Sequence, residues 1–383
     1  MRWGVPIAAA AVIGAAIGAG PVIAAVSGDP VLPERSAEQL LADAAAAAKK
    51  AGGPPQMSGT VQQTASLGLP ALPSQGGSAS PLAMLSGSRE IKVWYGAEDR
   101  LRVALPGQMS ETNLIVNGDQ AWYWDSGTNT ATKLKLPAEG EQSPAKPVPS
   151  PTDLTPQQVA QGFLDRVDES TGVSVTNTAE VAGRAAYQLV LTPKAQGSLV
   201  QEVRLALDGE NYMPLQVQVF AKGSAEPAFQ VGFTQVTFTA PAAENFAFTP
   251  PAGAKVEEQD LGKLGGQQPE HGKEAEKAAE DVKVVGEGWT TVAVLPFKPG
   301  EQKPAEQKPG EQKLGELKPE EQQSGSSEAQ ALTAILEQAT PVSGAWGSGK
   351  MIKTKLVTAL LTDDGRLLAG AVTPDELVKV AGQ

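Results

Sequence analysis

The side chains that most often perform protein chemistry are scarce in this sequence of 383 residues. Cysteine is absent, which excludes disulfides, thiolate metal sites, cysteine nucleophiles and lipidation on cysteine. The only histidine is His271, so histidine-dependent catalytic triads and sites with several histidine ligands are excluded as well. The formal net charge of −12 disfavours a nucleic-acid partner, which requires a basic surface.

Three motifs have the residue types of functional sites but lack the necessary context. Asp363-Asp364 and Glu257-Glu258 are adjacent carboxylates, which we assign to a hairpin and a linker rather than to acid–base pairs. The first pair has no further oxygen ligands at the spacing that a calcium loop requires. Residues 344–350 resemble a phosphate-binding loop, but Met351 stands where serine or threonine is needed. The sequence therefore predicts no catalytic residue, no metal site, no cofactor and no enzyme activity.

Aromatic side chains gather on neighbouring predicted strands, in Trp94-Tyr95 and Trp122-Tyr123-Trp124. An ordinary hydrophobic core is one explanation for them. The alternative is a hydrophobic cavity, lined by one face of a sheet with aromatic residues at its rim. The lining or rim residues would then be Trp94, Tyr95, Val103, Leu114, Trp122, Tyr123, Trp124, Phe229 and Phe233. In a non-enzymatic protein outside the cytoplasm, such a cavity implies an acyl chain or a similar ligand.

The N-terminus has the features of an export signal or a membrane anchor. Residues 4–26 are uncharged and mostly apolar, and they follow the basic start Met1-Arg2-Trp3. At about 1.5 Å per residue this segment would span about 34 Å, enough to cross a bilayer core of about 30 Å. Residues 1–28 are therefore either a signal peptide that is cleaved or an anchor in the cell membrane. Both alternatives place the remainder of the chain outside the cytoplasm.

A helix and a long series of strands follow. Ser36 and Gln39 have capping-box spacing, and Gly52-Gly53 ends the helix that they begin. A second helix is predicted from Pro156 and a third from Ser327. Between and after them, alternating apolar residues predict eleven to fifteen strands, nearly all joined by hairpin signals.

Three turns fix the expected register of the hairpins. A two-residue loop at Asn117-Gly118 would place Leu114 opposite Ala121, with Trp122 and Trp124 on the other face beside Ile115. A three-residue loop over residues 208–210 would place Leu205 opposite Met213 and Val203 opposite Leu215. At Asp364-Gly365, the expected register puts one set of apolar residues on a shared face: Val357, Leu361, Leu368 and Val372.

A meander with so many strands must curl or close. We therefore predict an α+β fold, in which a strongly curved antiparallel sheet forms a half-open barrel. Its helices would pack on or in the concave side. Such a sheet commonly encloses a cavity.

Several of these runs resemble the lipoprotein-carrier superfamily, which includes LolA and the sensor domain of RseB-type regulators. The resemblance rests on Val93-Trp94-Tyr95, on Leu114-Ile115-Val116-Asn117-Gly118 and on the Trp122-Tyr123-Trp124-Asp125 run that follows. The segment from Phe246 to Ala254 resembles the closing strand of actinobacterial members. The resemblance implies a half-open barrel, plugged by helices, that holds acyl chains in a hydrophobic cavity.

The predicted organisation is a carrier-like domain with two low-complexity segments after it. Residues 36–256 form the half-barrel and residues 257–281 an acidic linker. Residues 282–383 add strands and a helix, which we expect to complete the same domain and its sheet, because they make too few strands for a separate core. Within them, residues 298–326 hold a disordered repeat of the KPGEQ type.

Two functions fit these features, and a third alternative is a structural envelope protein whose core is simply full. The first is a non-catalytic, membrane-associated carrier that binds lipid or lipoprotein acyl chains outside the cytoplasm. The alternative is an envelope-stress sensor that binds such a ligand and signals through a membrane-protein partner. Both predict lipid or acylated lipoprotein and the cell membrane as partners.

Overall fold

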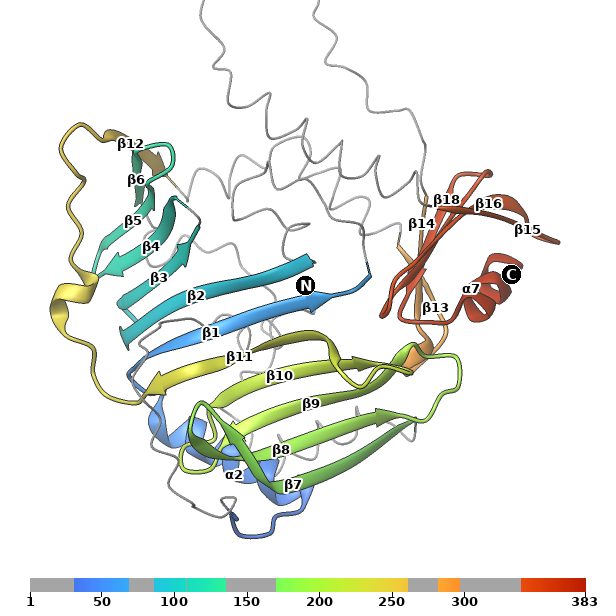
Figure 1. The fold of residues 1–383 in the computed structure, drawn as a ribbon, viewed down its shortest axis with the longest axis horizontal. Helices are drawn as coiled ribbons and strands as arrows, with labels where there is room; N and C mark the ends of the chain where they lie inside the picture. The colour runs from blue at the N-terminus through green and yellow to red at the C-terminus, as the bar shows by residue number, and fades with distance from the viewer. Residues whose placement is uncertain (1–30, 69–85, 108, 136–169, 261–281, 297–338) are drawn as a thin grey trace, which may run out of the picture.

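The computed structural model describes residues 31–68, 86–107, 109–135, 170–260, 282–296 and 339–383. These residues form two sheets and two α-helices, α2 (Ala37–Ala51) and α7 (Pro374–Ala381). The larger sheet has twelve strands in the order β12-β6-β5-β4-β3-β2-β1-β11-β10-β9-β8-β7, and its ends do not pair with each other (Figure 1). The α+β fold with a large, curved, unclosed antiparallel sheet is thereby confirmed.

The first half of the larger sheet comprises β1 (Met57–Ser66), β2 (Ser86–Ala97), β3 (Arg100–Pro106), β4 (Glu111–Asn117), β5 (Gln120–Asp125) and β6 (Thr130–Lys135). The second half comprises β7 (Thr171–Val181), β8 (Arg184–Pro193), β9 (Val200–Asp208), β10 (Pro214–Ala221) and β11 (Pro227–Thr237). The two halves meet where β1 pairs with β11. The short 3-10 helix η3 (Ala243–Phe246) leads from β11 to β12 (Lys255–Asp260), which pairs with β6 in parallel. The first residues of the predicted linker, Glu257 to Asp260, are therefore strand.

Helix α2 has the predicted ends. The Ser36 side chain accepts a hydrogen bond from the Gln39 backbone N–H at 3.1 Å, and the Gln39 side chain accepts one from the Ser36 N–H at 3.0 Å. Gly52 ends the helix with a left-handed φ of 70°. The helix packs Leu40 against Tyr187, Leu189 and Leu207, and it lies against β7–β9 in Figure 1.

Replacing the cap residue tests this arrangement. We expect Ser36→Ala to lower the free energy of unfolding by about 1 kcal/mol, because a backbone N–H at the helix start loses its acceptor. Chemical denaturation followed by tryptophan fluorescence would measure the loss. Ser174→Ala is the control, because Ser174 is an exposed serine of β7. Equal stabilities of the two variants would contradict a capping role for Ser36.

The two faces of the larger sheet differ in polarity. Register places apolar side chains of both halves on one face, here called the apolar face. It includes Ile91, Val93, Leu101, Val103, Leu114, Val116, Val203, Leu205, Val217, Val219, Phe229 and Val231. Along β1, β2 and β8–β11 the opposite face carries Gln62, Thr64, Ser88, Glu90, Gln188, Arg204, Gln216, Gln218 and Gln230. An antiparallel sheet with one apolar and one polar face exposes only the polar one fully to water.

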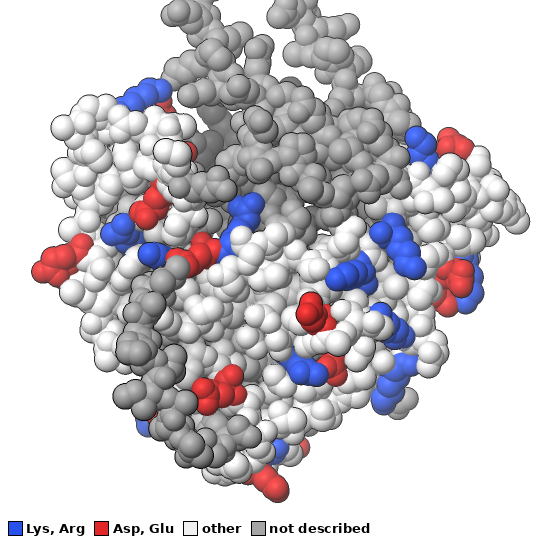
Figure 2. Space-filling model, viewed as in Figure 1, with Lys and Arg blue, Asp and Glu red and all other residues white. Residues whose placement is uncertain are grey.

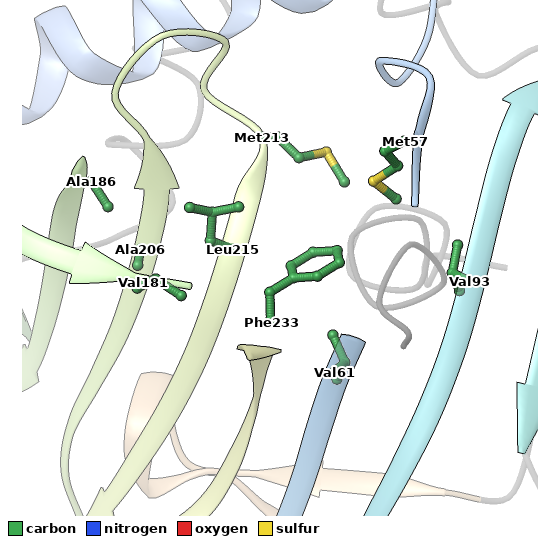
Figure 3. Close-up of a cluster of buried hydrophobic side chains, with 9 residues drawn as sticks. All are labelled: Met57, Val61, Val93, Val181, Ala186, Ala206, Met213, Leu215 and Phe233. Atoms are coloured by element: carbon green, nitrogen blue, oxygen red, sulfur yellow. The ribbon is translucent and has the colours of Figure 1, made fainter. Parts of the chain in front are cut away.

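A core cluster joins the two halves of this sheet. Met57, Val61 and Val93 from β1 and β2 converge with Phe233 of β11 and with Met213, which lies between β9 and β10 (Figure 3). All five side chains are buried. Because residues far apart in the sequence supply this cluster, it stabilises the β1–β11 junction rather than any single hairpin.

Two hairpins differ from the expected register, β4–β5 by two residues and the second by one. In β4–β5, Leu114 pairs with Tyr123 instead of Ala121, so the loop is Gly118-Asp119. Gly118 has φ 62°, and a loop at Asn117-Gly118 would have required a positive φ at the asparagine as well. The prediction that Trp122 shares a face with Ile115 is confirmed, because the two residues are direct cross-strand partners.

The second of these hairpins joins β17 (Thr358–Thr362) to β18 (Arg366–Gly370). Leu368 pairs with Leu360 rather than with Leu361. The Thr362 hydroxyl accepts a hydrogen bond from the Arg366 N–H at 2.9 Å, which widens the loop. Val357 and Leu361 therefore do not share the buried face of Leu368.

The loop between β9 and β10 is also longer than expected, because Leu205 pairs with Val217 and Val203 with Val219. The Asp208 carboxylate explains this length. It accepts hydrogen bonds from the backbone N–H groups of Glu210 at 3.0 Å and Asn211 at 3.1 Å, which folds the chain into a wider turn.

A buried ion pair lies at the same loop. The Asp208 side chain is fully buried, and the Arg184 guanidinium bonds to it through Nε and, at 3.1 Å, through Nη2. Nη2 also reaches the exposed Glu210 carboxylate at 2.8 Å, and the guanidinium stacks on Phe238 at 4.8 Å from the ring centroid. The hydrogen bonds that Arg184 donates to Asp208 and Glu210 raise its pKa. The Arg184–Asp208 ion pair thus links the β7–β8 turn to the β9–β10 loop.

Residues 282–383 do not complete the larger sheet, contrary to our expectation. Their described strands form a second sheet in the order β13-β14-β18-β17-β16-β15. Besides β17 and β18, this sheet contains β13 (Lys283–Val285), β14 (Val292–Pro296), β15 (Thr340–Gly344) and β16 (Gly347–Lys353). The strand order brings β14 next to β18, a pairing between distant segments that hairpin signals do not show. Helix α7 covers one face of this sheet, with Leu377 packed among Val292, Leu360 and Leu368.

The two sheets touch through side chains and backbone. Leu356, between β16 and β17, and Ala371, directly after β18, pack with Val200, Ala221 and Ala228 of the larger sheet. The Leu199 N–H donates to the Ala371 carbonyl at 2.8 Å, and Thr373 N–H to the Gly197 carbonyl at 2.7 Å. These contacts are consistent with a single domain, which stays a prediction.

Several predicted segments lie outside the described residues. They are the apolar segment 4–26, the helices expected from Pro156 and Ser327, and the repeat at 298–326. Within the described ranges, neither helix has the length and apolar character needed to cross a bilayer.

Candidate functional site

The nine residues predicted to line a cavity lie on opposite faces of the larger sheet. Six of them are on the apolar face: Tyr95, Val103, Leu114, Tyr123, Phe229 and Phe233. The other three, Trp94, Trp122 and Trp124, are on the opposite face. A single surface can therefore include only one of the two sets.

The apolar face forms continuous rows across neighbouring strands. One row runs from Val93 through Val103 and Leu114 to Tyr123, four residues that are successive cross-strand partners. Val93 is buried, Val103 and Leu114 are half-buried, and the Tyr123 side chain is 36% exposed. The row therefore passes from a packed core to accessible surface.

The same face continues into the second half of the sheet, where α2 covers part of it. Phe233 is buried in the core cluster beside Val61, whereas Phe229 is half-buried near the start of β11. Val203, Leu205, Val217 and Val219 are also half-buried. Side chains that are apolar and partly accessible over several strands suit an apolar ligand.

Two tyrosines supply hydroxyl groups to this face. Burial raises the pKa of Tyr95, and the nearby carboxylates of Glu98 and Asp99 raise it further. Burial likewise raises the pKa of Tyr123, with Asp125 adding to the effect and a hydrogen bond with Thr112 opposing it. Both groups are neutral hydrogen-bonding partners at physiological pH.

The three tryptophans have structural partners on the opposite face. The Phe248 ring lies 5.6 Å from Trp122 and 5.9 Å from Trp124, centroid to centroid. The Arg102 guanidinium lies 5.2 Å from the centroid of Trp94 and donates from Nε to Asn113 at 3.0 Å. For this set, the geometry supports the interpretation as ordinary packing.

The segment from Phe246 to Ala254, which the resemblance implied to be a closing strand, is not a strand and instead packs over Trp122 and Trp124. After β11 the chain crosses the first half of the sheet as η3 and then joins β6 through β12. Phe246 is buried in this crossing, next to Gly96, where an added Cβ would lie 3.0 Å from the phenylalanine ring. The alternation of Phe246 and Phe248 was the available signal, because it indicates a segment with one buried side.

The carboxylate pairs and the loop-like motif have structural roles. Asp364 accepts hydrogen bonds from Arg366 and Thr362, which lower its pKa, and Glu258 pairs with Lys135 at 2.8 Å. Gly349 and Lys350 lie within β16, not in a phosphate-binding loop. Within the part of the chain that the structure describes, no three histidine, aspartate or glutamate side chains gather as metal ligands would.

Charge is dispersed on the surface seen in Figure 2. Basic side chains there are interspersed with acidic ones and with wide uncharged areas. This distribution is unlike the continuous basic stripe of a nucleic-acid interface.

No protein-family model matches the sequence, and no curated protein is significantly similar to it. Solved structures similar to this chain include the Pseudomonas aeruginosa MucA/MucB complex. The matched chain has 15% identity and a TM-score of 0.39, over 90% of this chain and 96% of the other. LprF from Mycobacterium bovis has 13% identity and a TM-score of 0.27, over 57% of this chain and 97% of its own.

A third similar structure, NE2245 from Nitrosomonas europaea, is a LolA superfamily protein, the group that the sequence resembles. It has 11% identity and a TM-score of 0.20, over 56% of this chain and 99% of its own. Identities and TM-scores at this level assign neither a ligand nor a partner to this chain.

Proposed function

We propose that this protein is a non-catalytic carrier that works outside the cytoplasm at a membrane and binds the acyl chains of lipids or lipoproteins on its apolar face. The observation that supports this most is the unclosed sheet itself. Its partly accessible apolar side chains extend from Tyr123 in β5 to Val203 in β9. Each methylene group buried on such a face contributes about 0.8 kcal/mol, so one long chain gives ample affinity without a catalytic group.

Extraction of bound lipid tests this function. The full-length protein would be purified, its lipids extracted into organic solvent, and their molar ratio to protein measured by mass spectrometry. We expect an acylated species at a near-stoichiometric ratio, and delipidated protein should take up lipid again from phosphatidylglycerol vesicles. Protein that carries no lipid and takes up none would contradict both the carrier and the sensor.

Substitutions on the two faces identify the binding surface. We expect Leu114→Gln to weaken binding of a fluorescent fatty acid about tenfold, because a polar amide would replace an apolar group in the middle of the row. Trp122→Phe is the matched control on the neighbouring strand, because its ring faces Phe248 on the other side. Fluorescence titration measures both affinities. A larger loss in the tryptophan variant would place the ligand on the wrong face for this proposal.

The sensor remains a second candidate because of the second sheet. Its edge strands β13 and β15 each pair on one side within the described residues, and an edge strand is a natural template for pairing with another chain. Cross-linking in membranes, followed by identification of the attached protein, separates the two functions. A specific membrane protein joined to β13 or β15 would favour the sensor.

A further inference from the structure

One end of the apolar face is in contact with the second sheet. Three residues from the segments that connect its strands or follow β18, Trp289, Leu356 and Ala371, pack in one cluster with residues at the ends of β1, β9, β10 and β11. Val203, Val219 and Phe229 are the members of the cluster that belong to the apolar face. The opposite end of the same strands is occupied by Met57, Met213 and their neighbours in the core cluster. An apolar ligand lying along these strands therefore meets the second sheet at one of its ends.

Trp289 is held in place by its indole N–H. This group donates a hydrogen bond to the Thr171 hydroxyl at 2.7 Å, at the start of β7. The tryptophan belongs to the one-turn helix η4 (Gly288–Thr290) between β13 and β14. Its hydrogen bond reaches the outermost strand β7, while its ring packs with side chains from strands nearer the middle. The ring is half-buried and thus retains accessible surface.

Leu356 and Ala371 are fixed by backbone contacts with the larger sheet. The neighbour of Leu356, Lys355, donates from its N–H to the Leu67 carbonyl at 2.8 Å and from Nζ to the Ser66 hydroxyl at 3.0 Å. Ala371 accepts from the Leu199 N–H at 2.8 Å. Hydrogen bonds of these residues or of a direct neighbour therefore hold all three against the larger sheet.

We propose that Trp289, Leu356 and Ala371 form an apolar stop that limits how far an acyl chain extends along the apolar face, with Trp289 setting the preferred chain length. This inference rests on the proposed function. Because the stop is lined by apolar side chains, it receives the methyl end of the chain and disfavours a charged headgroup. The second sheet would then determine ligand selectivity, in addition to any role in contacting a partner.

Removing the indole should lengthen the preferred chain. Full-length Trp289→Ala and the unchanged protein would each be delipidated and given an equimolar mixture of saturated fatty acids of increasing length. Each further methylene that gains a buried position is expected to raise the bound ratio of longer to shorter chains about fourfold. Two such methylenes would shift that ratio about fifteenfold in the variant. Mass spectrometry of the extracted acids gives the ratio directly.

Two controls keep failure of the stop distinct from failure of the proposed function. Trp346→Ala removes the same group from the second sheet, where it packs with Met351 and Leu360 away from the junction, and should leave the length profile unchanged. Thr171→Val keeps the shape of the hydrogen-bond acceptor but frees the indole, so it should broaden the profile. If the unchanged protein binds fatty acids and Trp289→Ala has the same profile, the stop is refuted while the carrier stands. If the unchanged protein binds none, the carrier itself is refuted.

A label on the ligand tests the stop without any substitution. A fatty acid with a photoreactive diazirine at its methyl end would be bound to the unchanged protein and activated by light. We expect the attached peptides to contain Trp289 or Leu356. Attachment confined to peptides from β4 and β5 would overturn the proposal. Because the experiment uses the unchanged protein, its result is decisive even if Trp289→Ala fails to fold.

Discussion

Replacing Arg184 with alanine is expected to lower the free energy of unfolding by about 3 kcal/mol, because the substitution leaves the Asp208 carboxylate buried without its cation. The Asp208 side chain has no exposed surface, whereas that of Arg184 is 26% exposed. Two backbone N–H groups would still bond to the carboxylate, and the arginine is partly hydrated already. Both circumstances place the loss at the lower end of the range for buried pairs. Urea denaturation followed by tryptophan fluorescence measures it.

Glu210→Gln is the matched control for this substitution. It removes the second carboxylate that Arg184 contacts, but the Glu210 side chain is 84% exposed, and exposed ion pairs contribute about 0.5 kcal/mol. We therefore expect the glutamine variant to resemble the unchanged protein. Similar losses in both variants would show that the buried position of Asp208 has no special role. A small loss in Arg184→Ala would mean that water reaches the carboxylate.

Leu360→Ala is expected to destabilise the protein by about 3 kcal/mol, since it removes a fully buried side chain from the core between the second sheet and α7. If the two sheets form one cooperative domain, as we propose, the loss of stability affects the strands of both sheets. Amide hydrogen exchange through global unfolding should then accelerate about a hundredfold in β8 and β9 as well as in β17 and β18. Exchange measured by mass spectrometry resolves these strands.

The neighbouring leucine provides the control. Leu361 is half-buried on the other face of β17, so Leu361→Ala should cost about 1 kcal/mol or less. Acceleration confined to the second sheet in Leu360→Ala would show that the junction does not couple the two sheets. The single-domain proposal would then be wrong, although both sheets would keep their structures.

Local signals predicted local structure well. Ser36, Gln39 and Gly52 determine the ends of α2 through contacts within one or two turns, so the sequence was sufficient there. Alternation likewise separated Trp122 from Leu114. Hairpin register was less predictable because single side-chain hydrogen bonds decide it. Thr362 and Asp208 each bond to backbone groups in their own loop and change its length, which propensities do not reveal.

Long-range pairings could not be predicted from local patterns. Neither the parallel β12–β6 pair nor the β14–β18 pair is joined by a turn, so no sequence signal specifies either. The candidate site was affected in the same way. Nothing near Trp122 or Trp124 indicates that Phe248, from a distant segment, packs against them. The predicted site therefore included these tryptophans, although alternation alone already placed them on the face opposite Leu114.

The β1–β11 junction also has a consequence for how the chain folds. Pairing of strands that follow one another in the sequence builds β1–β6 on one side and β7–β11 on the other, and such local pairings form quickly. Joining them requires Val61 to find Phe233, and the loop entropy of the intervening chain opposes that step until the core cluster begins to form. During synthesis β1 leaves the ribosome long before β11 exists, so its second edge stays unpaired in the interval. Gln62, Gln63 and Thr64 supply polar side chains to β1 while this edge is unpaired. Their polarity lowers the tendency to aggregate before β1 and β11 pair.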